Sequence, residues 1–466
     1  MKFILLFIST LTLSLSAAKK PNVVFILVDD LGWSDLACYG SKSYKTPNLD
    51  KFAASGVRFT DAYAGGSVCS PTRAAIMTGR SPARLKITDW IPGARVKNPK
   101  LLSPKIHNEL PYNEVTIAEV LKDNGYKTAY VGKWHLGGDK FLPGTQGFDI
   151  NIGGFHKGSP PGGYYSPYKN PYLADGPAGE YLPDRLTDES IKFIEQEKGG
   201  DKPFFLYLSY YTVHTPIQAS KKHLGMYKDS ITKSSAPIKE RDGKTLGSQS
   251  NAAYASMVTA MDENVGRLIS KINEFGLDKN TIIIFTSDNG GLSTKKAPGP
   301  TCNLPLRAGK GWCYEGGIRT PLIIKAPGVK SSVNNTPVIS MDYFPTILEL
   351  AGLEQKPKLH VDGLSLLNEL KANGQKLSRG TLVWHYPHYH GSTWRPGAAI
   401  RSGKWKMVEF FESGEKELFN LDDDLGEHKN LASKYPEVLK ELSAKMKKWR
   451  LENNAEMPKP NPDFKE

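Results

Sequence analysis

The chain has 466 residues, 39% of them hydrophobic, and its 61 lysines and arginines outnumber its 48 aspartates and glutamates, giving a formal net charge of +13. The hydrophobic fraction supports a real core, whereas four cysteines are too few for a disulfide scaffold and no internal stretch is apolar enough to span a membrane. The basic excess suits a sulfated or phosphorylated partner, and because the sequence has no motif that reads nucleic acid, we predict no nucleic-acid partner.

The N-terminus has the pattern of a secretory signal. Lys2 supplies a positive charge, residues 3–15 are mostly apolar, and Ser16-Ala17-Ala18 offers small side chains for cleavage. We therefore predict a signal peptide at residues 1–18 and an exported protein, either periplasmic or secreted.

Strands and helices alternate along most of the chain. Continuous apolar runs predict buried strands at residues 23–28, 126–131, 204–211, 281–285 and 322–325. Helices are predicted at residues 46–56, 116–122, 186–197 and 252–275. This alternation predicts an α/β fold with a mixed, mostly parallel sheet flanked by helices.

The character of the sequence changes after about residue 375. Short antiparallel strands are predicted at residues 399–400, 405–411 and 417–421, followed by a helix over residues 436–451. We therefore divide the mature chain into a catalytic domain at residues 19–374 and a smaller C-terminal α+β subdomain at residues 375–466.

A cysteine opens a short predicted helix that ends at Gly79. In Cys69-Ser70-Pro71-Thr72-Arg73 the proline favours the first helical turn, so Cys69 is predicted at a helix N-terminus, where unpaired N–H groups attract anions. Arg73 lies one turn further on, and its fork of donors suits an oxyanion at the same point. The segment therefore predicts a nucleophile inside an anion-binding site.

Polar side chains follow the predicted strands where each strand ends: Asp29, Asp30, Lys133, His135, His214, Asp288 and Asn289. Ligands bind at the carboxyl edge of an open α/β sheet, so we expect these side chains to meet there. The four oxygen-bearing side chains favour Ca²⁺ or Mg²⁺ over zinc. Lys133 and His135 point the same way if the chain is extended. Together with His214 and with Lys310 from a glycine-rich loop, they would neutralise a tetrahedral anion.

Together these motifs resemble those of the type I, formylglycine-dependent sulfatase family of the alkaline phosphatase superfamily, and in particular exported bacterial carbohydrate sulfatases. The matching segments are Val28-Asp29-Asp30-Leu31-Gly32-Trp33, Cys69-Ser70-Pro71-Thr72-Arg73, Gly132-Lys133-Trp134-His135-Leu136-Gly137, His214-Thr215-Pro216, Ser287-Asp288-Asn289-Gly290-Gly291 and Gly309-Lys310-Gly311. The resemblance covers nearly the whole mature chain. It implies an alkaline-phosphatase-like fold and the hydrolysis of sulfate esters.

The resemblance also implies a role for each site residue. Cys69 would be oxidised to formylglycine by a formylglycine-generating or sulfatase-maturating enzyme. The ligands of Ca²⁺, which is favoured over Mg²⁺, would be Asp29, Asp30, Asp288, Asn289 and residue 69. Arg73, Lys133 and His135 would hold the hydrated aldehyde, and His214 and Lys310 would bind the sulfate and the leaving oxygen. One hydroxyl of the hydrate would attack sulfur with help from Asp288, Lys310 or His214 would protonate the leaving alkoxide, and His135 would take a proton from the second hydroxyl.

A second set of residues is predicted to frame a sugar: Asp89, Trp90, His385, His388, His390, Trp394 and Arg395, with the tyrosine-rich loop from Phe155 to Pro183. Aromatic faces with histidine and arginine donors suit a hydroxylated ring, and the alternative is that these residues pack the subdomain against the main domain. The run from Ala83 to Trp90 resembles that of sulfatases acting on galactose-type sugars. The predicted partner is therefore a sulfated saccharide of that type.

Two other functions are compatible with the sequence. A phosphonate or phosphodiester hydrolase can share the Cys-x-Pro-x-Arg segment, although Lys310 and the oxygen-only metal site favour sulfate. A non-catalytic protein that binds sulfated glycans would keep Cys69 unmodified.

Cys302 and Cys313 flank a short loop and are candidates for a disulfide in an oxidising compartment.

Overall fold

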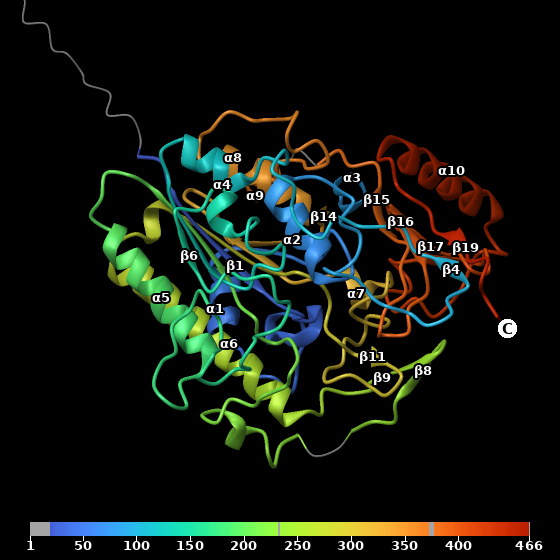
Figure 1. Cartoon of the computed structure of the whole chain (residues 1–466), viewed down its shortest axis with the longest axis horizontal. Coiled ribbons are helices and arrows are strands. Elements are labelled where there is room, and N and C mark those ends of the chain that lie inside the picture. Colours follow the sequence, from blue (N-terminus) through green and yellow to red (C-terminus); the bar gives the residue numbers. More distant parts are fainter. Residues whose placement is uncertain (1–18, 232–233, 372–376, 466) are drawn as a thin grey trace, which may run out of the picture.

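The computed structural model describes residues 19–231, 234–371 and 377–465 (Figure 1). The predicted signal peptide at residues 1–18 and the predicted domain boundary at residues 374 and 375 lie outside these ranges. Within them, no helix combines the length and the hydropathy that a membrane span requires.

The centre of the fold is an eight-stranded sheet with the strand order β13-β2-β12-β10-β1-β7-β5-β6 (Figure 1). Its strands are β1 (Asn22–Val28), β2 (Val57–Phe59), β5 (Lys127–Gly132), β6 (Ile150–Ile152), β7 (Phe204–Ser209), β10 (Thr281–Ser287), β12 (Leu322–Lys325) and β13 (Ser332–Asn334). Neighbours pair in parallel except where β12 meets β10 and β2. Four strands predicted from apolar runs, β10, β1, β7 and β5, are adjacent, so their carboxyl ends meet at one edge.

Helices cover both faces of this sheet, and β1 shows how its residues divide between them. Its residues Val24, Ile26 and Val28 pack with α1 (Pro47–Ser55), α5 (Leu182–Glu197) and α6 (Ala252–Glu274). The alternate residues Val23, Phe25 and Leu27 pack with α2 (Cys69–Thr78), α4 (Ile117–Asp123), α8 (Tyr343–Leu350) and α9 (Leu367–Lys371). A strand buried on both faces requires a continuous apolar run, as β1 has.

The C-terminal part is a second, antiparallel sheet with a helix on it (Figure 1). Its strands are β15 (Leu382–Tyr386), β16 (Gly397–Ser402), β17 (Trp405–Phe410) and β18 (Lys416–Asn420), in that order, and its helix is α10 (Pro436–Glu452). Leu442 and Met446 of α10 are buried against the sheet. The predicted fold class, a mostly parallel α/β sheet with a smaller α+β subdomain, is confirmed.

Several short elements join these parts. They are β3 (Ala62–Tyr63) with β14 (Val338–Ile339), β4 (Leu101–Leu102) with β19 (Lys459–Pro460), a small sheet of β8 (Ile238–Glu240), β9 (Gly243–Thr245) and β11 (Thr294–Lys295), and the helices α3 (Pro82–Leu85) and α7 (Glu315–Ile318). The thiols of Cys302 and Cys313 are both free and buried, so the candidate disulfide is not formed.

A fully buried ionic group connects the C-terminal sheet to the loop that follows Lys310. Lys406 of β17 lies 2.8 Å from Glu315 Oε1 and 2.9 Å from Glu427 Oε1, and all three side chains are inaccessible to solvent. The backbone N–H of Glu315 donates to Glu427 Oε2 at 2.7 Å. Lys406 therefore lies between two buried carboxyl groups where the two parts of the molecule meet, and Glu315 also pairs with Arg319 at 3.1 Å.

Replacing Lys406 with methionine is expected to destabilise the fold by about 3–5 kcal/mol, because it leaves the buried carboxyl group of Glu427 without its cation and leaves Glu315 paired with Arg319 alone. Denaturant unfolding of both proteins measures this difference. The double variant Lys406→Met/Glu427→Gln, which also removes one of the carboxylates, should recover part of the loss. A single variant as stable as the unaltered protein would contradict this account.

Candidate active site

The acidic residues after β1 and β10 meet because these two strands pair in register. Val28 is opposite Ser287, so the next residues, Asp29 and Asp288, leave the sheet side by side. The backbone N–H of Asp30 donates to Asp288 Oδ1 at 3.1 Å, and Asn289 Nδ2 donates to Asp30 Oδ1 at 2.8 Å. All four side chains are buried. The sheet thus gathers the four predicted metal ligands into one cluster.

Three cations pair with the three carboxylates of this cluster. Lys133 Nζ lies 2.5 Å from Asp29 Oδ2, Arg73 Nη2 lies 2.8 Å from Asp288 Oδ2, and Lys310 Nζ lies 2.6 Å from Asp30 Oδ1. Arg73 Nη1 also donates to the carbonyl of Lys133 at 2.8 Å, which ties the helix of Cys69 to the end of β5. The site therefore consists of three buried ion pairs that lie close together.

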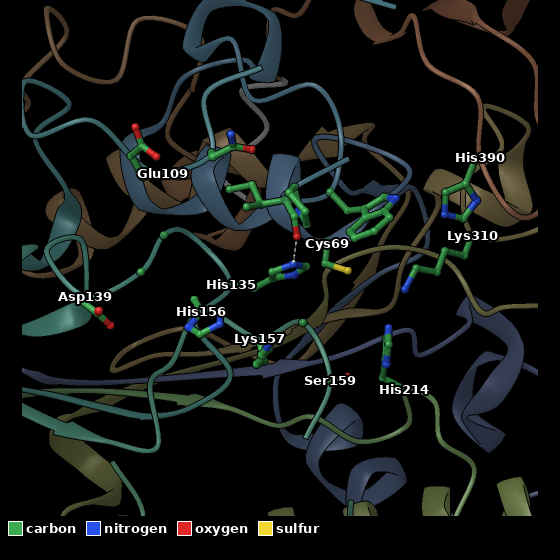
Figure 2. A pocket seen from close by; sticks show the side chains of 17 residues that line it. Cys69, Glu109, His135, Asp139, His156, Lys157, Ser159, His214, Lys310 and His390 are labelled. Carbon is green, nitrogen blue, oxygen red and sulfur yellow. Dashed lines mark hydrogen bonds between the residues drawn. The ribbon is translucent and has the colours of Figure 1, made fainter. Parts of the chain in front are cut away.

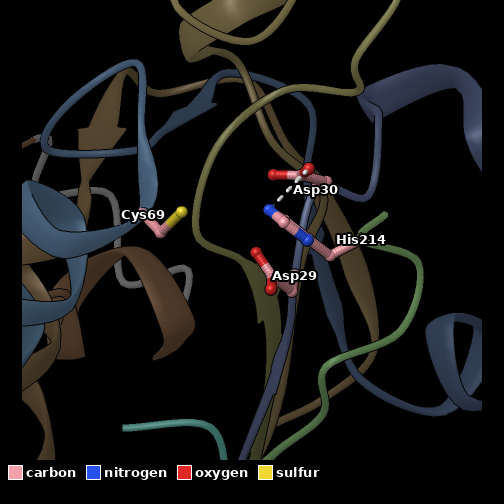
Figure 3. Close-up of side chains that lie close together, drawn as sticks. All are labelled: Asp29, Asp30, Cys69 and His214. Carbon is pink, nitrogen blue, oxygen red and sulfur yellow. Dashed lines mark ion pairs between the residues drawn. The ribbon is translucent and has the colours of Figure 1, made fainter. Parts of the chain in front are cut away.

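A divalent cation fits this cluster. One ligand atom from each of Asp29, Asp30, Cys69 and His214 lies within 4.8 Å of the others (Figure 3). Asp29 Oδ1 and Asn289 Oδ1 are buried and accept no hydrogen bond from any described residue. Burial raises the pKa of Asp29 well above its usual value, and the charges of Asp288 and Asp30 raise it further, although Lys133 opposes them. Unsatisfied hard oxygens beside crowded carboxylates are the donor set that Ca²⁺ or Mg²⁺ takes.

Cys69 faces this cluster from the first position of α2. It is 2% exposed, all ten residues of the helix are buried, and the helix ends at Gly79 with φ 65°. A Cβ on Gly79 would lie 2.4 Å from His360 Cβ, so only glycine allows this close approach. Burial raises the pKa of the Cys69 thiol, and the opposing charges of Lys133 and Lys310 do not reverse that shift.

Lys133 and His135 reach the site by a path that the sequence did not predict. The chain is not extended after β5, because Gly132 has φ 103° and His135 has φ 60°. The expectation that an extended chain aligns these two side chains is therefore wrong. Lys133 turns toward Asp29, whereas His135 Nε2 lies 2.7 Å from the carbonyl of Ile91 and its buried Nδ1 has no hydrogen-bond partner among the described residues. Burial and, secondarily, Lys133 hold the pKa of His135 well below its usual value.

A pocket of about 790 Å³ opens onto this site (Figure 2). Cys69, His135, His214 and Lys310 line its inner part. His214 Nε2 lies 3.8 Å from Asp30 Oδ2. Burial, followed by the charge of Lys310, lowers the pKa of His214 to about 3. The pocket thus brings a cysteine, two imidazoles and a lysine together around one space.

Of the seven residues predicted to frame a sugar, Trp90 and His390 line this pocket. The other five, Asp89, His385, His388, Trp394 and Arg395, do not. The loop from Phe155 to Pro183 divides in the same way: its first residues line the pocket, whereas Tyr164, Tyr168 and Tyr181 lie in the hydrophobic core.

Four of those five residues make buried contacts elsewhere in the protein. Asp89 accepts hydrogen bonds from Tyr386 Oη at 2.8 Å and from the N–H groups of Trp90 and Ala94. His388 Nε2 lies 2.8 Å from Thr88 Oγ1, and His385 Nε2 lies 2.9 Å from the carbonyl of Glu456. The ring of Trp394 packs against Trp312 and Phe410. These contacts correspond to the alternative in which the residues pack the C-terminal subdomain.

Arg395 lies in a separate surface groove. Its guanidinium donates to Asp242 at 2.7 Å and to Glu412 at 2.8 Å. The groove is also lined by His390, which therefore stands between it and the pocket that Cys69 lines.

The pocket is also lined by polar residues that the sequence did not single out, Asn108, Glu109 and Asp139, beside His156 and Lys157 of the predicted loop. Asp139 lies two residues after Gly137, where the matched segment ends, and this proximity was an available signal. No comparable signal marks Glu109.

His385 is expected to make the fold sensitive to acid. Burial lowers its pKa to about 4, with Arg450 lowering it further and the hydrogen bond to Glu456 and the charge of Glu409 opposing the shift. In the unfolded chain, the imidazole of residue 385 takes up a proton near pH 6.5. The contribution of His385 to the free energy of unfolding is therefore fully present above that pH, and it falls by about 3 kcal/mol as the pH drops toward 4. Melting curves between pH 4 and 7.5 should show a smaller loss for His385→Phe. Parallel pH profiles would refute this assignment.

Comparison with known proteins places these features in a family. A family model described as Sulfatase matches residues 21–353, and one described as N-sulphoglucosamine sulphohydrolase, C-terminal, matches residues 308–452. Human arylsulfatase A is 33% identical, covering 93% of this chain and 88% of its own, and mouse N-acetylgalactosamine-6-sulfatase is 32% identical, covering 90% and 78%. The crystal structure of Ps i-CgsB in complex with k-i-k-neocarrahexaose is similar, with a TM-score of 0.76 and 30% identity over 93% of each chain.

Proposed function

Because the chain belongs to the type I sulfatase family and is a sulfuric ester hydrolase, we propose that it releases sulfate from a saccharide through a formylglycine made from Cys69. The observation that carries this proposal is the position of Cys69. It begins a buried helix, lines the pocket and faces a cluster of carboxylates and cations. A hydrated formylglycine at this position supplies one hydroxyl as nucleophile and a second whose deprotonation frees the enzyme from sulfate.

Asp29, Asp30, Asp288, Asn289 and residue 69 would hold a Ca²⁺ ion. Bound there, it would supply positive charge next to the nucleophile and the sulfate oxygens. The unpartnered oxygens of Asp29 and Asn289 support this ligand set. Mg²⁺ has the same ligand chemistry but demands a stricter octahedral geometry, so Ca²⁺ is the proposed cofactor.

The remaining side chains bind the anion and move protons. Arg73 fixes Asp288 in place, and Asp288 assists the attacking hydroxyl. Lys310 and His214 line the pocket, where the ester oxygen would depart. Lys310 would donate a proton or hydrogen bond to that oxygen, whereas His214, whose pKa is lowered to about 3 and whose Nδ1 donates to the carbonyl of Thr215, would first have to gain a proton on Nε2. His135 donates from Nε2 to Ile91, which leaves Nδ1 free to accept the proton of the second hydroxyl.

The proposed substrate is a sulfated carbohydrate, with a galactose-type sugar as the preferred class. Trp90 and His390 of the predicted sugar-binding set line the pocket and can contact a ring. The similarity to mouse N-acetylgalactosamine-6-sulfatase and to a protein crystallised with neocarrahexaose supports the same class. We further propose that the chain is exported through its N-terminal signal and that a maturation enzyme oxidises Cys69.

The test combines mass and activity. Protein made with a maturation enzyme should show the mass loss of a cysteine-to-formylglycine conversion at the peptide containing residue 69, and it should release sulfate from 4-nitrophenyl sulfate and from a defined sulfated galactose. Bis(4-nitrophenyl) phosphate and a phosphonate monoester serve as comparison substrates. Faster turnover of either phosphorus ester would favour the phosphodiester or phosphonate alternative. An unmodified thiol in active protein would refute the proposed nucleophile.

A further inference from the structure

The pocket also carries two carboxyl groups that the site described above does not use. Glu109 and Asp139 both line the cavity, and neither makes a hydrogen bond or ion pair with any described residue. Glu109 is half-buried, whereas Asp139 is exposed. A carboxylate that lines a cavity without a protein partner is available to a ligand that brings hydrogen-bond donors.

Glu109 is held in the pocket by close contacts rather than by a flexible reach. The N–H of Leu110 donates to the carbonyl of Leu136 at 2.9 Å. This hydrogen bond holds the segment that contains Glu109 against the segment that follows His135. Gly137 has φ 127°, and a Cβ there would lie 2.8 Å from Glu109 Cβ, so the two segments meet only because residue 137 has no side chain. The backbone that carries this acceptor is therefore fixed at the edge of the pocket.

The two carboxyl groups of the pocket lie on the side away from Lys310. Figure 2 shows Glu109, Asp139, His156 and Lys157 on one side of Cys69, and Lys310, His214 and His390 on the other. A ligand that fits both sides has an anion at one end and hydrogen-bond donors at the other. A sulfate ester on a sugar with free hydroxyls has this form, and a second anionic group at the far end would meet a carboxylate in a partly desolvated space.

In the neighbouring groove, three of the four charged side chains, Asp242, Arg395 and Glu412, pair with one another, and the fourth, Lys100, lies over the ring of Phe464. The guanidinium of Arg395 is already engaged by Asp242 and Glu412. Contacts to a saccharide there would have to compete with existing ion pairs. Recognition of the sugar is therefore assigned to the side of the pocket where the polar groups are unpaired.

We propose that Glu109, supported by Asp139, accepts hydrogen bonds from the hydroxyl groups of the sulfated sugar and makes the enzyme prefer a monosulfated sugar to one with a second anionic group. This inference rests on the proposed sulfatase function and narrows its substrate class. Lys157 also lines the pocket, at its exposed rim, and is the side chain that would favour a second anion instead.

The test uses the mature enzyme with three substrates: a monosulfated hexose, the same hexose carrying a second sulfate, and 4-nitrophenyl sulfate, which has no hydroxyl groups. Glu109→Gln should lower kcat/KM for the monosulfated hexose about tenfold more than for 4-nitrophenyl sulfate, because a charged acceptor becomes neutral. The same variant should reduce the preference for the monosulfated over the disulfated sugar. Asp123→Asn, an exposed carboxylate on α4 outside the pocket, is the matched control and should behave as the unaltered enzyme does.

Two results would overturn the inference. Equal losses on all three substrates would mean that Glu109 only supports the fold. A change in the preference between the two sugars after Lys157→Gln, with none after Glu109→Gln, would assign selection to the lysine. An unaltered enzyme that hydrolyses none of the three sulfate esters would instead refute the proposed function itself.

Discussion

Replacing Cys69 with alanine is expected to abolish sulfate release while leaving the fold intact. Residue 69 is the proposed nucleophile, and removing an enzyme's nucleophile typically lowers kcat by about 10⁴-fold or more. Alanine is smaller than cysteine and keeps the helix, so α2 should form as before. Sulfate release from 4-nitrophenyl sulfate and a melting curve, measured on the same preparation, separate loss of chemistry from loss of structure.

Cys69→Ser distinguishes the formylglycine mechanism from a simple hydroxyl nucleophile. A serine that is not oxidised has no second hydroxyl, so any sulfated intermediate would be trapped instead of collapsing to an aldehyde. We expect no turnover in a host whose maturation enzyme acts only on cysteine. Cys38→Ser, at a half-buried thiol outside the pocket, is the matched control and should retain activity. Normal turnover by Cys69→Ser in such a host would exclude the proposed mechanism.

The inner site followed from the sequence because it depends on strand ends. Asp29, Asp288 and His214 come after strands whose positions are evident from apolar runs, and a parallel sheet brings such ends together. The local path of the chain after β5 could not be predicted from the sequence. His135 reaches the pocket only because Gly132 and His135 both adopt positive φ. Neighbouring residues in the sequence do not reveal such a turn.

The sugar side of the pocket was harder to predict because it depends on contacts between distant segments. His385 lies in β15, whose aromatic residues have the composition expected of a surface that binds a sugar. In the structure these residues are buried, packed against α10 on one face of the sheet and against the core on the other. Composition alone does not distinguish these two uses of an aromatic strand. Glu109 enters the pocket through its contact with Gly137, and nothing in its own neighbourhood in the sequence signals that contact.

Removing the divalent cation is expected to lower both activity and thermal stability. The positive charge that the ion supplies to the reacting groups is worth several kcal/mol, so chelation should reduce kcat by about a hundredfold or more. A ligand that binds only the folded state stabilises it by about 4 kcal/mol when present at 1,000 times its Kd. The melting temperature should therefore fall on chelation and recover when Ca²⁺ is added, and metal content is measured in parallel by mass spectrometry.

Two buried aspartates allow this stabilisation to be traced to the proposed ligands. Asp29 and Asp35 are both inaccessible to solvent, but Asp35 accepts hydrogen bonds from Gly32, Tyr254 and Thr301, whereas one oxygen of Asp29 accepts none from the described residues. Asp29→Asn should lose most of the Ca²⁺-dependent rise in melting temperature. Asp35→Asn should be less stable but keep that rise, because its side chain is not a proposed ligand. A melting temperature and metal content that do not respond to chelation in the unaltered enzyme would remove the cation from the mechanism, and the three carboxylates would then have only Lys133, Arg73 and Lys310 to balance them.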